Sequence, residues 1–296
     1  MSVGVGGIED EHEHEHEHVN EHEVHPGARR MVGIKDVFTV INALGGVVAL
    51  ILCAEGRWLW ASYAVMAGYA ADLVDGTIAR ALREANRFGA EFDTAADFVT
   101  QAVAPALIVY LAYRDAHAAL GLGPLGAQIL GAALAAALIV PGCARYARRN
   151  VRPVPLDFAW IGLPQVVASF VMLGFVNSVA VRLVPGGLWM GVALVPALAA
   201  LELSNLPYKN HRGRRRNFPH VRVLIGGFVL TSVAAFLLAP RFAWDLLLFW
   251  ELGYVLTARF ALTPEERRLV PIEVRAADAR LRAEEIARFR GGVGRI

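Results

Sequence analysis

Residues 37–54 read VFTVINALGGVVALILCA, a stretch without a single charged side chain. A helix needs about twenty such residues to cross the hydrocarbon of a bilayer. Seven further, mostly apolar stretches follow, and the sequence therefore predicts about eight transmembrane helices: 37–54, 58–79, 93–113, 123–144, 158–178, 188–205, 221–239 and 242–260. We expect an all-α, polytopic integral membrane protein.

The composition supports the same class. Apolar residues make up 56% of the 296 positions, charged residues only 19%, and the mean hydropathy is +0.44. A soluble core cannot hide that much apolar surface, so an ordinary soluble enzyme is excluded. The net charge of +2 says little by itself, because the location of the basic residues matters more. We therefore expect membrane lipids, and not nucleic acid, around the chain.

The basic residues lie mostly on one side of the predicted helices. Eight spans place 25 Lys and Arg residues on the side of both termini and only four on the other, namely Arg57, Arg114, Arg182 and Arg241. Basic loops stay in the cytoplasm. The sequence thus predicts a multi-pass protein of the cell membrane with both termini in the cytoplasm.

Three regions follow from this pattern. Residues 1–30 contain a Glu/His alternation at 11–18 and few apolar residues, and should form a disordered cytoplasmic tail. Residues 31–260 form the transmembrane domain. Residues 261–296 open with Thr263-Pro264-Glu265-Glu266, a helix start, and should form a basic cytoplasmic helix. Contact with anionic headgroups and plain solvation both remain open for this helix.

Four aspartates interrupt the second and third spans. Asp72 and Asp75 are three residues apart, and Asp93 and Asp97 are four apart, so each pair lies on one helical face. Adjacent antiparallel helices can direct all four carboxylates to one place. Each Asp within a membrane helix costs roughly 2.5–3.5 kcal/mol. The cluster therefore needs a partner of opposite charge.

Two divalent cations would neutralise the four carboxylates. All-oxygen ligands favour Mg²⁺ or Mn²⁺. Gly76 and Gly89 allow a close backbone approach, and Arg80 offers a planar fork for phosphate. The pattern predicts an active site for metal-bound diphosphate at the cytoplasmic membrane surface. An ion-coupled transporter is the alternative from another class, although no internal repeat is visible.

The aspartate region resembles the signature of the CDP-alcohol phosphatidyltransferases. The matching pattern is Asp72-x₂-Asp75-Gly76-x₂-Ala79-Arg80-x₈-Gly89-x₃-Asp93-x₃-Asp97. The resemblance implies transfer of a phosphatidyl group from a CDP-linked lipid to an alcohol, with release of CMP. It implies metal binding by the aspartates, with Asp97 beside the metals as the catalytic base. It also implies that Gly76, Ala79, Arg80 and Gly89 bind the CDP-lipid.

Weaker segments are similar to the phosphatidylserine synthase branch of that family. They are the run Phe38–Gly46, Val103-Ala104-Pro105-Ala106 and the region Ala144–Asn150. This similarity implies CDP-diacylglycerol as donor and L-serine as acceptor. Choline, inositol phosphate or glycerol phosphate as acceptor, and an archaeal-type ether lipid as donor, remain open. We expect Arg145 and Asn42 to contact the acceptor, and the family implies a possible homodimer.

Overall fold

The computed structural model describes residues 34–82, 87–210, 219–258 and 260–292. The chain divides into two compact units, Met1–Met31 and Val32–Ile296, and all described residues belong to the second. The His/Glu-rich segment 1–30 and its predicted disorder therefore lie outside the described residues.

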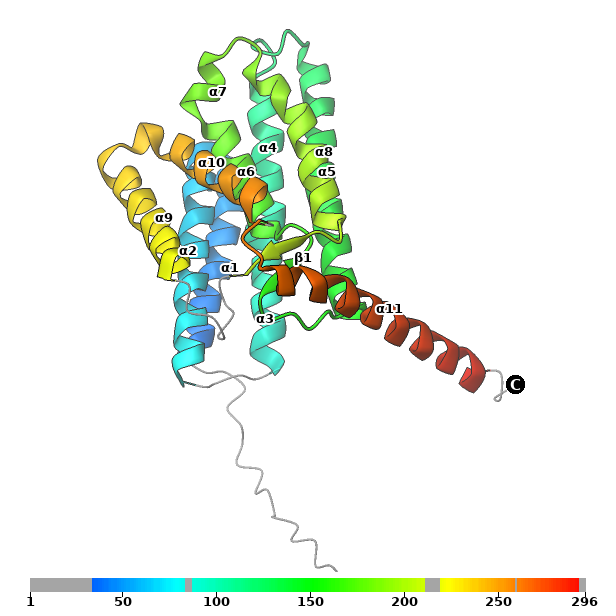
Figure 1. Ribbon diagram of the computed structural model, residues 1–296. Helices are drawn as coiled ribbons and strands as arrows, with labels where there is room; N and C mark the ends of the chain where they lie inside the picture. Colours follow the sequence, from blue (N-terminus) through cyan, green and yellow to red (C-terminus); the bar gives the residue numbers. More distant parts are fainter. Residues whose placement is uncertain (1–33, 83–86, 211–218, 259, 293–296) are drawn as a thin grey trace, which may run out of the picture. The chain divides into compact units, whose positions relative to one another are not determined.

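The described part of the chain is helical apart from one short two-stranded ribbon (Figure 1). The third helix continues through one π-helical turn into the fourth. The helices are α1 (Ile34–Ala54), α2 (Trp58–Leu82), α3 (Arg87–Phe98), η1 (Val99–Val103), α4 (Ala104–Asp115), α5 (Pro124–Val151), α6 (Gln165–Asn177), α7 (Val179–Leu183), η2 (Gly187–Trp189), α8 (Met190–Leu203), α9 (Pro219–Leu238), α10 (Pro240–Thr257) and α11 (Pro264–Gly292).

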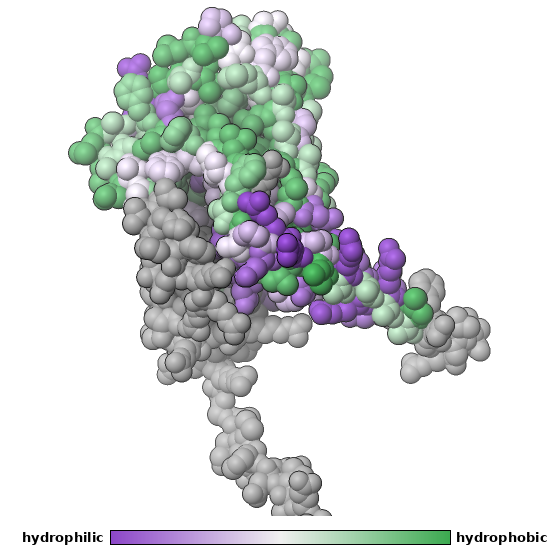
Figure 2. Space-filling model, in the orientation of Figure 1, coloured by the Kyte–Doolittle hydropathy of each residue, from purple (hydrophilic) through white to green (hydrophobic). Residues whose placement is uncertain are grey.

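The predicted all-α class is confirmed. Each of the eight predicted spans overlaps one helix or several consecutive helices. Among the described residues, three segments are long and apolar enough to cross a membrane: Val37–Ala54, Glu91–Asp115 and Pro124–Val151. Three shorter apolar helices accompany them. Figure 2 shows apolar surface over the upper bundle and hydrophilic surface near the start of α11. The number of crossings stays a prediction.

The outer helices turn apolar side chains away from the protein. Only 28% of the span in α1 is buried, and Leu44 and Ile51 are among its exposed residues. Ile129 of α5 and Leu238 of α9 are exposed in the same way. Exposed apolar faces on long helices fit a lipid environment better than water.

The centre of the bundle is formed by α4 and α6 (Figure 1). Every residue of α6 from Val167 to Asn177 is buried, so this helix is enclosed on all sides. Its neighbours include α4, α8 and α10. A helix that is apolar around its whole circumference is typical of such an enclosed position. The helix α6 therefore anchors the elements that carry the candidate site.

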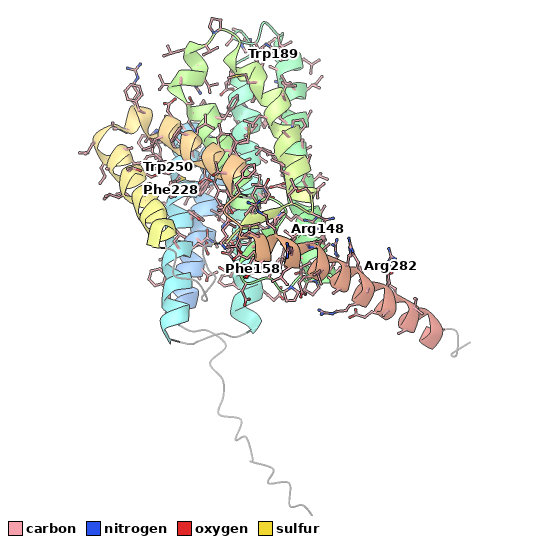
Figure 3. All side chains as sticks on the ribbon, in the orientation of Figure 1. Arg148, Phe158, Trp189, Phe228, Trp250 and Arg282 are labelled. Atoms are coloured by element: carbon pink, nitrogen blue, oxygen red, sulfur yellow. The ribbon has the colours of Figure 1, made fainter. Side chains whose placement is uncertain are left out.

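Helices α9 and α10 form a hairpin against this centre. The rings of Phe228 in α9 and Trp250 in α10 meet edge to face, with centroids 6.0 Å apart (Figure 3). Such aromatic pairs add about 0.5–1.5 kcal/mol to the burial of the rings. The hairpin is thus held by side-chain packing as well as by its short connection.

The predicted helical span 158–178 is wrong in its first residues. Residues Ala159–Ile161 form strand β1, which pairs antiparallel with β2 (Pro207–Lys209), placing Trp160 opposite Tyr208. The helix begins only at Gln165, because Gly162 has a φ of +76° and a proline precedes Gln165. Backbone pairing between two distant loops is not visible in local hydropathy.

Helices α1 and α2 approach each other through glycines. A Cβ atom on Gly45 would lie 2.7 Å from Cα of Gly68 and 3.1 Å from the carbonyl oxygen of Ala64. Small residues allow this close packing in membrane proteins. The contact sets the position of α1 beside the aspartates of α2.

We expect Gly45→Ala to lower the free energy of unfolding by about 1–3 kcal/mol, because the two helices must separate to admit the methyl group. Gly253→Ala in α10 is the matched control, since a Cβ there meets no atom within 4 Å. Thermal unfolding of both variants in one detergent measures the difference. Equal melting temperatures would show that the contact tolerates a side chain.

The predicted helix start at residue 263 is confirmed by a reciprocal cap. The backbone N–H of Thr263 donates to Oε2 of Glu266 at 2.9 Å, and the N–H of Glu266 donates to the Thr263 hydroxyl at 3.3 Å. The helix is tied to β2 by Lys209 and Glu266, whose side chains are each 12% exposed and whose Nζ and Oε1 atoms lie 2.6 Å apart.

Burial raises the pKa of Glu266, but hydrogen bonds from Lys209 and Thr263 outweigh it and hold that pKa below its usual value. The stabilisation of the fold by the Glu266 carboxylate is present above its unfolded pKa and is lost as the pH falls through its folded pKa.

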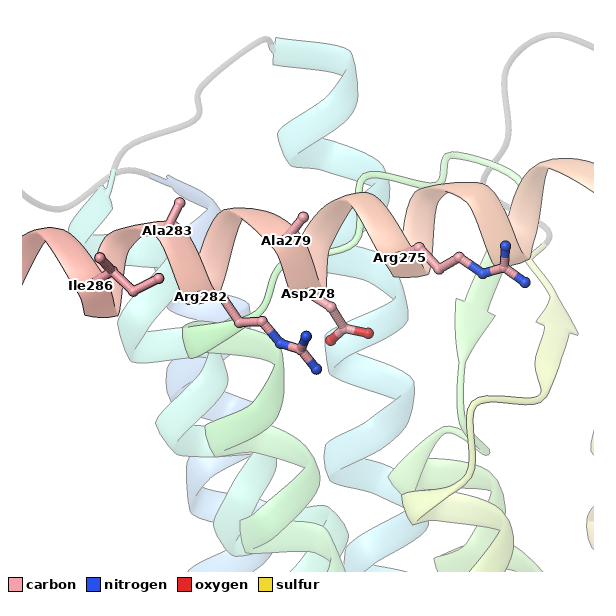
Figure 4. A pocket seen from close by; sticks show the side chains of 6 residues that line it. All are labelled: Arg275, Asp278, Ala279, Arg282, Ala283 and Ile286. Carbon is pink, nitrogen blue, oxygen red and sulfur yellow. The ribbon is translucent and has the colours of Figure 1, made fainter.

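A second ion pair joins Arg152 to Asp278 at 2.7 Å. Arg275, Asp278 and Arg282 leave α11 on a different side from Ala279 and Ala283 (Figure 4).

Candidate active site

Three of the four predicted aspartates converge. One carboxylate oxygen from each of Asp72, Asp93 and Asp97 lies within 4.8 Å of the other two, and all three side chains are half-buried. Asp72 comes from α2, while Asp93 and Asp97 are one turn apart on α3. Like charges so close together disfavour one another, and a divalent cation relieves this repulsion. Hard oxygen ligands of this kind fit Mg²⁺ or Mn²⁺.

The remaining predicted residues of the aspartate signature are only partly described. Asp75, Gly76, Ala79 and Arg80 belong to helix α2, but their side chains lie outside the described residues. Gly89 is buried near the start of α3. The signature therefore spans the end of one helix and the start of the next, as its spacing predicts.

Asp97 is held by two side-chain amides. Nδ2 of Asn42 donates to its Oδ1 at 2.9 Å, and Nε2 of Gln101 donates to the same oxygen at 2.7 Å. The contact of Asn42 with the acceptor stays a prediction, and its side-chain amide lies on Asp97. Asn42 is fully buried, and its backbone carbonyl oxygen accepts a hydrogen bond from the Thr100 hydroxyl. These bonds fix the direction of the Asp97 carboxylate.

The π-helical turn η1 provides Gln101. In a regular α-helix the carbonyl of Gln101 would accept from the N–H of residue 105, but Pro105 has no N–H. The hydroxyl of Ser169 in α6 donates to that carbonyl instead. Single π-helical turns are frequent at functional sites. Here the turn links the aspartates to the buried helix α6.

We expect Gln101→Leu to raise the Mg²⁺ concentration needed for half-maximal activity about tenfold, because a hydrogen-bond donor that orients Asp97 is lost. Gln128→Leu is the control, since Gln128 lies exposed on α5. The Mg²⁺ dependence of CMP release from a CDP-linked lipid measures the effect. An unchanged requirement in a folded variant would show that Asn42 alone is sufficient.

Arg145 lies at a cavity near the end of α5. The cavity has a volume of about 100 Å³ and is lined by Arg145, Arg148, Arg149 and Arg152 together with the segment around β1. Arg148 has a structural role in this cavity, next to the two-stranded ribbon of β1 and β2 (Figure 3). Its guanidinium donates to the backbone carbonyls of Ile161, Glu202, Leu203 and Ser204. These bonds cap the end of α8.

Two residues of interest were not predicted from the sequence. Gln101 follows Asp97 by four residues, a helical spacing that is a usable signal. Glu202 is a carboxylate inside the apolar span 188–205, and an ionisable residue in such a span is itself a signal of function. Both residues are buried.

Comparison with known proteins identifies the family of this chain. Residues 34–201 match the family model described as CDP-alcohol phosphatidyltransferase. The chain belongs to the CDP-alcohol phosphatidyltransferase family. It is therefore a membrane enzyme of phospholipid synthesis, and the predicted resemblance is confirmed. The transporter alternative is set aside, and the acidic cluster of Asp72, Asp93 and Asp97 could bind the divalent metal that this family uses.

Several similar proteins bear the name CDP-diacylglycerol–serine O-phosphatidyltransferase. One from Helicobacter pylori strain J99 is 28% identical over 182 residues, covering 60% of this chain and 72% of the relative. One from Mycobacterium bovis is 25% identical over 234 residues, covering 75% and 78%. One from Methanocaldococcus jannaschii is 25% identical over 226 residues, covering 76% and 93%.

Proposed function

We propose that this enzyme transfers a phosphatidyl group from CDP-diacylglycerol to the hydroxyl of L-serine, forming phosphatidylserine and releasing CMP. The observation that carries the proposed chemistry is the convergence of Asp72, Asp93 and Asp97. The choice of serine is supported by its place in the names of the similar proteins and by Arg145 at the end of α5.

Asp72, Asp75, Asp93 and Asp97 would hold two divalent cations, Mg²⁺ or Mn²⁺. When bound, these cations neutralise the charge of the diphosphate and of the departing CMP. Gly76, Ala79, Arg80 and Gly89 would bind the CDP-lipid. Arg80 presents a fixed pair of donors to phosphate, which a lysine cannot reproduce.

Asp97 would take the proton of the serine hydroxyl. Its Oδ1 accepts two amide N–H groups, which hold the carboxylate in a fixed orientation. The serine oxygen then forms a bond to the phosphorus that carries the diacylglycerol, and the bond from that phosphorus to the CMP oxygen breaks. Asn42 and Gln101 act as positioning residues that hold Asp97 in place.

The proposed arrangement in the membrane follows the charge distribution. Eight helices within 31–260 would cross the membrane, with the active site and both termini on the cytoplasmic side. Residues 1–30 and 261–296 would then form cytoplasmic tails. Labelling of single cysteines placed at the two ends of α5 in intact cells tests this orientation.

A panel of acceptors tests the proposed reaction. Purified protein, Mg²⁺ and CDP-diacylglycerol are incubated separately with L-serine, choline, inositol phosphate and glycerol phosphate, and CMP release and the lipid product are followed. We expect serine to give the highest kcat/KM and phosphatidylserine to be the product. Faster transfer to another acceptor would overturn the choice of serine but would leave the metal-dependent transfer in place.

A further inference from the structure

Glu202 is a buried carboxylate near the end of α8. The residue is 1% exposed, and neither Oε atom has a hydrogen-bond partner among the described residues. Burial of a carboxylate without hydrogen bonds is costly, and nearly all buried polar groups in proteins are paired. Helix α8 otherwise consists of apolar and small residues. The position therefore calls for a partner with hydrogen-bond donors and a positive charge.

Arg145 lies on α5, near enough to Glu202 for their two charges to interact. Helix α5 packs against α8, and the charges of Arg145 and Glu202 attract each other electrostatically. Nε of Arg145 is also buried and makes no hydrogen bond to any described residue. The two opposite charges are thus neighbours that do not satisfy each other's hydrogen-bonding groups.

The other charged groups around the cavity have their own partners. Arg148 donates to backbone carbonyls, and Arg152 pairs with Asp278. Arg149 lies over the ring of Trp160, with its Cζ atom 5.9 Å from the ring centroid. From α10, the Tyr254 hydroxyl donates to the carbonyl of Lys209 at 3.0 Å. Among the described arginines that line the cavity, Arg145 is the one whose charge acts on Glu202.

We infer that Arg145 and Glu202 form a subsite for a zwitterionic amino acid, in which Arg145 binds the α-carboxylate and Glu202 binds the α-ammonium group. The inference rests on the proposed function and adds Glu202 as the residue that selects an amino acid over other alcohols. In an α-amino acid the carboxylate and the ammonium group are bonded to the same carbon atom. One ligand can therefore pair with both Arg145 and Glu202.

The subsite rejects acceptors that match only half of it. Choline has no carboxylate for Arg145, and glycerol phosphate has no ammonium group for Glu202. A site that is built to bind a charged group discriminates strongly against a ligand without it, because the buried partner is then left unpaired. The same logic separates L-serine from glycerate, which carries a hydroxyl in place of the ammonium group.

The test compares Glu202→Gln with wild type, using L-serine and glycerate as acceptors and CDP-diacylglycerol as donor. The change keeps the size of the side chain and removes its charge. We expect the serine KM to rise about tenfold or more, with the glycerate KM and the lipid KM within twofold of wild type. Glu251→Gln is the matched control, since Glu251 is a buried carboxylate of α10 outside the pair. An unchanged serine KM in folded Glu202→Gln would overturn the subsite.

A measurement on the wild-type enzyme covers the case in which the variant does not fold. L-Alanine has both charged groups but no hydroxyl, and it should inhibit competitively against serine. Propionate lacks the ammonium group and ethylamine lacks the carboxylate, so neither should inhibit at the same concentration. Equal inhibition by propionate would contradict a role for Glu202. Absence of any turnover of serine would instead refute the proposed acceptor itself.

Discussion

We expect EDTA, which removes divalent cations, to abolish CMP release, and we expect added Mg²⁺ or Mn²⁺ to restore it. Asp93→Asn lowers kcat by roughly a hundredfold to a thousandfold, because electrostatic stabilisation of the transition state is lost. The reason lies in the cluster itself: three carboxylate oxygens within 4.8 Å cannot bind a diphosphate of the same charge.

Asp115→Asn is the matched control for this prediction. Asp115 is exposed at the end of α4, where it pairs with Arg114 at 2.8 Å, and it takes no part in the cluster. We expect its activity to equal that of wild type. Steady-state CMP release at saturating CDP-diacylglycerol measures both variants. Full turnover in excess chelator would contradict the metal site, and wild-type activity of Asp93→Asn would contradict the role of that carboxylate.

Arg145→Ala should raise the serine KM by about 10- to 100-fold. A hydrogen bond between charged groups in a partly dehydrated pocket contributes about 1.5–3 kcal/mol, which corresponds to this range. The CDP-diacylglycerol KM should stay within twofold of wild type, because the proposed subsite assigns this guanidinium to the acceptor.

Arg149→Ala tests whether any arginine of the same cavity has this effect. Arg149 is exposed and stacks over Trp160, so its loss should leave the serine KM nearly unchanged. Initial rates over a range of serine concentrations provide both constants. A rise in the lipid KM of Arg145→Ala without a change in the serine KM would place Arg145 at the lipid phosphate instead.

The sequence was sufficient for the class of protein and for the aspartate pairs. Uncharged runs such as 37–54 are long and apolar enough for membrane helices, and the spacing of Asp93 and Asp97 places them on one helical face. These features depend on local periodicity and composition. They are therefore readable without knowledge of the tertiary contacts, and the start of the last helix at Thr263-Pro264 was predicted in the same way.

Only the tertiary structure decided what surrounds the aspartates. Asn42 is 55 residues from Asp97 in the chain, yet its side-chain amide donates to that carboxylate. The strand β1 exists because a distant loop pairs with it, where hydropathy alone predicted helix. The neighbourhood of Arg145 and Glu202 depends on how α5 packs against α8. Such contacts arise from the shape and close packing of whole helices, and no local pattern in the sequence encodes them.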